Sequence, residues 1–150
     1  RKLESDSLSD DTGLINLFVE SRGNTTFSGP EIVKTLNAVG MRHGEMSIFH
    51  WYEDSTSNSE TVLFSAANMY EPGTFDLNLI DSFETRGIVF FMQIEAHRDN
   101  ETILTKLLET ARSFSSSIEG SLNVTPGTRL DEYHILKFRR MIATEKDGNY

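Results

Sequence analysis

The chain has no cysteine, which excludes disulfide bonds and zinc sites built from thiolates. It is also poor in positive charge, because 14 Lys and Arg face 23 Asp and Glu and give a formal net charge of −9. This balance disfavours proteins that bind the phosphate backbone of nucleic acids or anionic lipid headgroups, since both need a basic face. A basic partner fits this chain better.

Long hydrophobic runs are missing as well. The longest strictly apolar run is Ile88 to Met92, whereas a membrane helix needs roughly 20 apolar residues. No signal-peptide pattern is present. The chain begins at Arg1 rather than at methionine. We therefore expect a piece of a longer protein, with any anchor or targeting segment outside it.

Signatures of catalysis and metal binding are scarce. The four histidines, His43, His50, His97 and His134, show none of the paired spacings typical of metal ligands. The sequence also lacks a GxSxG elbow, a P-loop and a GxGxxG turn. We expect no catalytic residue, no metal site and no cofactor, and hence a protein that is not an enzyme.

What is present fits one globular domain. The chain has 150 residues, and 37% of them are hydrophobic, which is enough for a single core. Residues 1–13 are polar and aperiodic, and we interpret them as the disordered end of a linker. Residues 145–150 look like a frayed tail. The expected domain therefore spans residues 14–144.

Hydrophobic periodicity predicts five strands and three helices. The strands are expected at 14–20, 46–51, 61–69, 87–94 and 121–124, and the helices at about 29–39, 100–119 and 126–142. Ser28 and Glu31 form a capping box, Asp99 or Asn100 caps the second helix, and Thr125 with Pro126 starts the third. Short connections favour antiparallel pairing. We therefore predict an α+β fold, with three helices on one face of a mainly antiparallel sheet.

The predicted strands are apolar on both faces. If Phe90 points to the helices, Val89 and Phe91 point the other way, where a half-exposed strand is normally polar. Three helices cover only one face of a sheet that is about 24–29 Å wide, so the other face should stay open. Alternation and strand order place eight apolar residues there: Leu14, Phe18, Met46, Ile48, Ala67, Met69, Val89 and Phe91.

This apolar excess has several interpretations. Loops could bury these residues, or they could be scattered singly. A contiguous patch would instead bind another protein, and its methionines would suit an adaptable peptide groove. The same face could also form a homodimer. An RNA-binding sheet with stacking aromatics is a further alternative, which the acidic balance disfavours.

Three segments of the chain resemble a known family. HGEMSIFH (43–50), FSAANMYEPGTFD (64–76) and GIVFFMQI (87–94) are similar to the C-terminal FtsZ-binding domains of the bacterial ZipA family, and the resemblance covers roughly residues 14–142. It implies a six-stranded antiparallel sheet with three helices on one face. On the other face, it implies a shallow apolar groove that binds the C-terminal tail of the tubulin-like protein FtsZ.

The resemblance also implies a place in the cell and a set of contacts. The domain would be a monomer at the cytoplasmic face of the inner membrane at the division site, held there by an N-terminal membrane helix and a linker outside this chain. Met46, Met69 and Phe91 match groove positions of the family, and Leu14 or a neighbour would supply a first-strand contact. The family's basic stretch before the last helix is replaced here by the uncharged NVTPGT (123–128), so a charged contact there does not carry over.

Overall fold

The computed structural model describes residues 12–53 and 61–147, and the side chains of residues 145–147 are left out of the description. Residues 1–11 of the expected linker and the last three residues of the expected tail lie outside the described residues. Thr12 and Gly13, which we assigned to the linker, are bonded to the sheet. The Ile94 N–H donates to the Gly13 carbonyl at 2.8 Å, and the Gln93 side chain donates to the Thr12 carbonyl at 2.9 Å.

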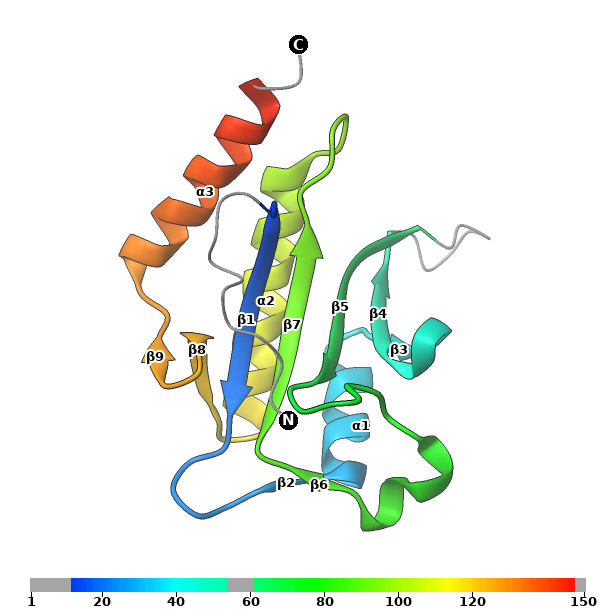
Figure 1. Ribbon diagram of the computed structural model, residues 1–150. Helices are drawn as coiled ribbons and strands as arrows, with labels where there is room; N and C mark the ends of the chain where they lie inside the picture. Colours follow the sequence, from blue (N-terminus) through cyan, green and yellow to red (C-terminus); the bar gives the residue numbers. More distant parts are fainter. Residues whose placement is uncertain (1–11, 54–60, 148–150) are drawn as a thin grey trace.

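A seven-stranded antiparallel sheet forms the centre of the molecule, in the order β3-β4-β5-β7-β1-β8-β9 (Figure 1). Its strands are β1 (Leu14–Glu20), β3 (Arg42–His43), β4 (Phe49–Tyr52), β5 (Val62–Asn68), β7 (Gly87–Gln93), β8 (Ser121–Thr125) and β9 (Thr128–Arg129), and β2 (Phe27–Ser28) pairs separately with β6 (Glu84–Thr85). The α+β class and antiparallel sheet are confirmed. The strand count exceeds six, and the edge strands β3 and β9, with two residues each, are too short to show a period.

The three main helices are α1 (Gly29–Ala38), α2 (Asn100–Ser117) and α3 (Glu132–Asp147), and two short 3-10 helices are η2 (Glu45–Ser47) and η3 (Leu77–Ser82). The predicted caps are present, because Ser28 Oγ accepts from the Glu31 N–H at 3.3 Å and Asp99 Oδ1 from the Thr102 N–H at 3.2 Å. Figure 1 shows α2 behind β1 and β7. Within the described ranges, no helix combines the length and the apolar character that a bilayer-spanning helix requires.

The predicted start of the third helix is wrong. Pro126 and Gly127 form the turn between β8 and β9, where Thr125 pairs with Thr128. Gly127 has φ +81°, the conformation that the third position of a type II turn needs after a proline. Proline is common at the start of both helices and turns of this kind. The glycine that follows it favours the turn, because glycine readily adopts the positive φ that the turn needs. The helix begins at Glu132 instead and continues to Asp147.

The side chains separate into two hydrophobic clusters. The larger one contains residues from the sheet and from all three helices. Phe90 is fully buried in it, with its ring centroid 5.3 Å from that of Phe114 in α2. The predicted direction of Phe90 is therefore confirmed, and with it the register of β7. The smaller cluster contains no residue of α1, α2 or α3 within the described part of the chain.

Candidate binding face

The smaller cluster has a buried centre, which we call the floor: Phe18, Ala67, Met69 and Val89. Three of these residues form a row across the sheet, because Phe18 pairs with Val89 and Val89 pairs with Ala67. Met69 follows the end of β5, and its N–H donates to the Gly87 carbonyl at 3.0 Å. A side chain at Gly87 would collide with Met69 Sδ, so this glycine lets Met69 lie flat against β7.

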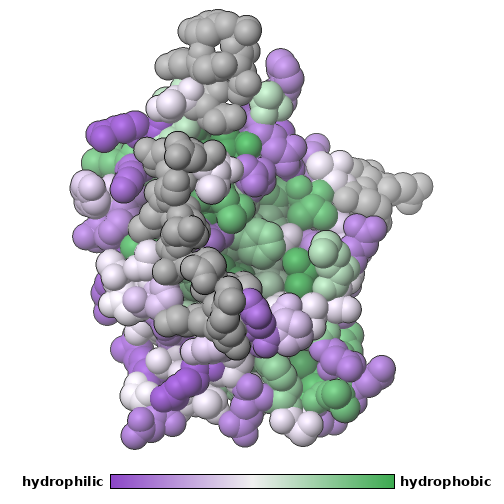
Figure 2. Space-filling view, viewed as in Figure 1, coloured by the Kyte–Doolittle hydropathy of each residue, from purple (hydrophilic) through white to green (hydrophobic). Residues whose placement is uncertain are grey.

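Three partly buried side chains, which we call the rim, pack against the floor: Ile48, Tyr70 and Phe91. Phe91 lies on the face opposite Phe90, as alternation predicts. Figure 2 shows hydrophobic residues gathered in the middle of this face, with hydrophilic residues beyond them. The structure thus assembles six of the eight predicted residues, those of the floor with Ile48 and Phe91, into one cluster, to which Tyr70 adds a residue that we did not predict.

The expectation that the whole set lies open is wrong for the floor. Its four side chains are only 0–6% exposed. Directly paired side chains in a sheet stand about 4.5–5.5 Å apart, so those in one row cover each other's flanks. Leu14, Ile48 and Phe91 are half-buried, and Met46 is 83% exposed. A ligand on this face would therefore meet the rim and Leu14 first.

Met46 does not lie in a strand, and the predicted strand over 46–51 is wrong at its start. Met46 and Ser47 have φ angles of 61° and 58°, whereas strands require negative φ. They belong to η2, and β4 begins only at Phe49. Ile48 has returned to the extended conformation, and its side chain reaches the floor. The exposed Met46 side chain therefore stands two residues before a rim residue.

Polar residues continue the face beyond Phe91. Phe91 pairs with Asn16 on one side and with Ser65 on the other, and Ser65 pairs with His50. Asn16, Ser65 and His50 are all buried. Alternation along each strand places Asn16 on the side of Phe18 and Ser65 on the side of Ala67, although we named only apolar residues as candidates for binding.

A hollow of about 260 Å³ opens where β5 and β7 separate. The pairing between these strands ends at Ser65 and Phe91, and β5 then bends away from β7 (Figure 1). Leu14 and Phe91 both line the hollow. The structure thus places the predicted first-strand residue near the predicted central aromatic residue.

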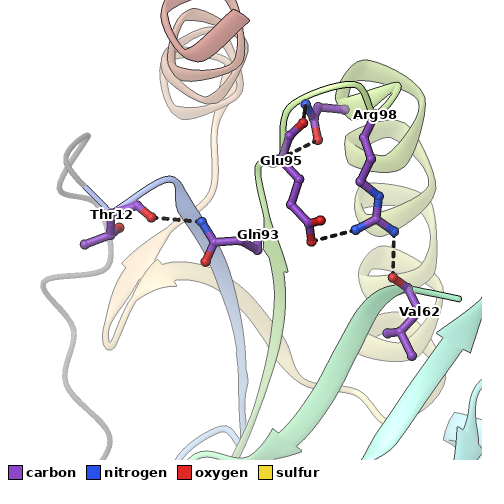
Figure 3. Close-up of polar contacts among 6 residues, drawn as sticks. Thr12, Val62, Gln93, Glu95 and Arg98 are labelled. Atoms are coloured by element: carbon purple, nitrogen blue, oxygen red, sulfur yellow. Dashed lines mark hydrogen bonds and ion pairs between the residues drawn. The ribbon is translucent and has the colours of Figure 1, made fainter. Parts of the chain in front are cut away.

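One arginine closes the far side of this hollow. The Nη1 atom of Arg98 lies 2.8 Å from Glu95 Oε2, and its Nη2 donates to the Val62 carbonyl at 2.6 Å (Figure 3). Arg98 therefore ties the start of β5 to the loop after β7. At the end of β7, the Gln93 side chain donates a hydrogen bond to the Thr12 carbonyl (Figure 3). This bond anchors the residues before β1.

The described residues do not form a site for a metal. Among them, no group of three or more His, Cys, Asp or Glu side chains is arranged to hold an ion. The face described above offers apolar contact surface, buried amide and hydroxyl groups and a single imidazole, His50. Such a set can bind an apolar segment of another protein by burying it.

Known proteins resemble this chain over most of its length. Residues 13–141 match the family model described as ZipA, C-terminal FtsZ-binding domain. The chain belongs to this family. The matched range begins just before β1 and ends within α3, so the ZipA domain includes the whole sheet and the face that carries the floor and rim.

Curated relatives named "Cell division protein ZipA" are similar along most of the chain. The relative from Pseudomonas syringae pv. syringae is 34% identical over 137 residues, which are 87% of this chain and 47% of that protein. The Azotobacter vinelandii relative is 35% identical over 127 residues (85% and 44%), and the Haemophilus ducreyi relative is 36% identical over 107 residues (71% and 32%). The chain thus spans less than half the length of these ZipA relatives.

Proposed function

We propose that this domain is a non-enzymatic binding module that holds the C-terminal tail of FtsZ during bacterial cell division. The family description names FtsZ as the ligand of such domains. The observation that carries the proposal is an apolar cluster on the sheet face to which no described helix contributes, with Phe91 half-buried at its rim. This cluster is the place where an apolar tail segment would bind.

Burial of apolar surface supplies the binding energy in this proposal. Each Å² of apolar surface removed from water contributes about 25 cal/mol, and the floor is already buried in the free domain. The gain must therefore come from side chains that still have area to bury, chiefly Met46, Phe91 and Ile48. Aromatic residues near the centre of an interface often cost about 2 kcal/mol or more when truncated, so Phe91 should dominate.

The wider role follows from the relatives. They are named as cell division proteins and are more than twice as long as their matched segments. We propose that a segment outside this chain anchors the protein to the inner membrane and that the domain, as a monomer on the cytoplasmic side, tethers FtsZ filaments there. The net charge of −9 would speed the encounter with a tail that contains Lys or Arg.

A titration with two matched variants tests the binding site. A fluorescently labelled FtsZ C-terminal peptide is titrated with wild type, Phe91→Ala and Leu136→Ala. Leu136 is 57% exposed and lies on α3, outside both clusters, so its truncation controls for loss of an exposed apolar side chain. We expect about 30-fold weaker binding for Phe91→Ala and wild-type affinity for Leu136→Ala. Equal affinities of wild type and Phe91→Ala would contradict the proposed site.

Two other measurements separate the alternatives. If the face forms a homodimer, sedimentation without peptide will show a dimer at micromolar concentration, and Phe91→Ala will shift it to monomer. If the domain binds RNA, it will retain an oligonucleotide in a salt-dependent manner. We expect a monomer and no salt-dependent RNA binding.

A further inference from the structure

The backbone around Met46 is strained. Met46 and Ser47 are consecutive non-glycine residues with φ near +60°, a conformation that L residues rarely adopt. The Met46 side chain is 83% exposed, so its own packing does not offset that strain. Strained residues persist when surrounding contacts fix them, and they gather at binding sites. The contacts that hold this turn are therefore informative.

Backbone bonds close the turn but leave one carbonyl weakly bonded. The Gly44 N–H donates to the Ile48 carbonyl at 3.0 Å, and the Ser47 N–H donates to the Gly44 carbonyl at 3.0 Å. The Glu45 carbonyl, directly before Met46, lies 3.5 Å from the Ile48 nitrogen. The shorter hydrogen bond of the Glu45 carbonyl is to a side chain, because His50 Nε2 lies 2.8 Å from it.

His50 links this turn to the centre of the face. A carbonyl can only accept a hydrogen bond, so Nε2 carries the proton and donates it. In the neutral ring, Nδ1 then accepts from the Ser65 hydroxyl at 2.8 Å. Ser65 pairs with Phe91 across the sheet. His50 is only 7% exposed, so a ligand on the face would hardly touch it.

We propose that His50 is a positioning residue that, supported by Ser65, holds the Glu45 carbonyl and so fixes the turn that presents Met46. This inference rests on the proposed function of the face. A side chain that is already held in its bound position loses less conformational entropy on binding. The exposed methionine, two residues before the rim residue Ile48, thereby acts as a prepared contact, although it contributes little packing to the free domain.

Two substitutions of His50 separate its two hydrogen bonds. The amide nitrogen of His50→Gln can reach the position of Nε2 and keep the bond to Glu45, whereas His50→Asn reaches only the position of Nδ1. The first readout needs no ligand: the ¹⁵N order parameter of the Met46 amide. We expect about 0.85 in wild type and His50→Gln and less than about 0.6 in His50→Asn. A rigid Met46 amide in a folded His50→Asn variant would overturn the proposal.

The second readout is affinity for the FtsZ-tail peptide. We expect His50→Asn to bind roughly 3- to 10-fold more weakly, about 0.7–1.4 kcal/mol, and His50→Gln to bind like wild type. In the Met46→Ala background, His50→Asn should cause no further loss, because the two residues act as a unit. An additive loss, or a loosened turn with unchanged affinity, would overturn the positioning role.

The failure of this inference and that of the proposed function give different results. If wild type does not bind the peptide, the proposed function fails, while the order parameter still tests the turn. If Phe91→Ala weakens binding but the His50 variants do not, only the positioning role fails. Should His50→Asn fail to fold, Ser65→Ala is the second variant. It removes the support of Nδ1, and we expect a lower Met46 order parameter and weaker binding, while wild-type values would overturn the proposal.

Discussion

Phe90 and Phe91 are neighbours on one strand and have the same side chain, yet the two faces of the sheet give them different surroundings. Phe90 is fully buried and packs edge-on against Phe114 of α2. Phe91 is half-buried and lies at the rim of a cluster to which no described helix contributes. The elements that cover each face, rather than the residue type, therefore determine whether an aromatic side chain is fully buried or keeps surface that a partner could cover.

Phe90→Ala should have the largest effect on stability. Truncating a buried phenylalanine costs about 3–5 kcal/mol through lost burial and the cavity left behind. Chemical denaturation with urea measures the change. Wild-type stability would mean that the register of β7 is shifted by one residue, which would exchange the two faces.

Met69→Ala should rank second, and it tests whether the floor is part of the folded structure. Met69 is fully buried against Gly87, so truncation should lower the free energy of unfolding by about 2–5 kcal/mol. Met69→Leu conserves the volume and should cost less than about 1.5 kcal/mol. If Met69→Ala unfolds like wild type, the floor does not support the fold.

Phe91→Ala should change stability much less than Phe90→Ala, by about 1 kcal/mol or less, because the side chain is only half-buried. Its main effect should be on FtsZ-tail affinity, since the proposed complex would bury the rest of the ring. The same urea titration measures the stability difference between the two variants. Equal losses of stability would remove the distinction between the faces.

Met46→Gly should have the smallest effect on stability and the opposite sign. Glycine adopts positive φ without strain, and the Met46 side chain packs little in the free domain. We expect the melting temperature to rise by about 1–2 °C, which corresponds to about 0.5 kcal/mol, while tail affinity falls. A lower melting temperature would show that the turn is not strained, and Met46→Ala, which keeps a Cβ, is the control that should not stabilise.

Much of this fold could be predicted because alternation and helical spacing are strong in its long elements. The predicted strand at 87–94 matches β7 to within one residue. The prediction that Phe90 and Phe91 point to opposite faces of the sheet is confirmed. The prediction that the third helix starts at Thr125–Pro126 is wrong because proline is found at the start of turns as well as helices. Only the pairing of β8 with β9 reveals the turn. The short strands β3 and β9 have no period to detect.

Alternation along the strands predicts which residues share the candidate binding face, but not how deeply each of them is buried. Alternation placed Phe18, Val89 and Phe91 together, and pairing across strands confirms that they are neighbours. The degree of burial could not be predicted, because it depends on packing between strands that are distant in the sequence. The contact of His50 with Glu45 accompanies two positive φ angles, at Met46 and Ser47, and no residue between Gly44 and Phe49 signals these angles.

The five methionines allow a direct test of which face binds the FtsZ tail. Met41, Met92 and Met141 belong to the large cluster with the helices, whereas Met69 lies in the floor and Met46 is exposed in the turn just before the rim residue Ile48. In a protein labelled with ¹³C at the methionine methyl groups, titration with the FtsZ-tail peptide should shift the Met46 and Met69 signals and leave the other three nearly unchanged. Shifts confined to Met41, Met92 or Met141 would contradict binding on the sheet face.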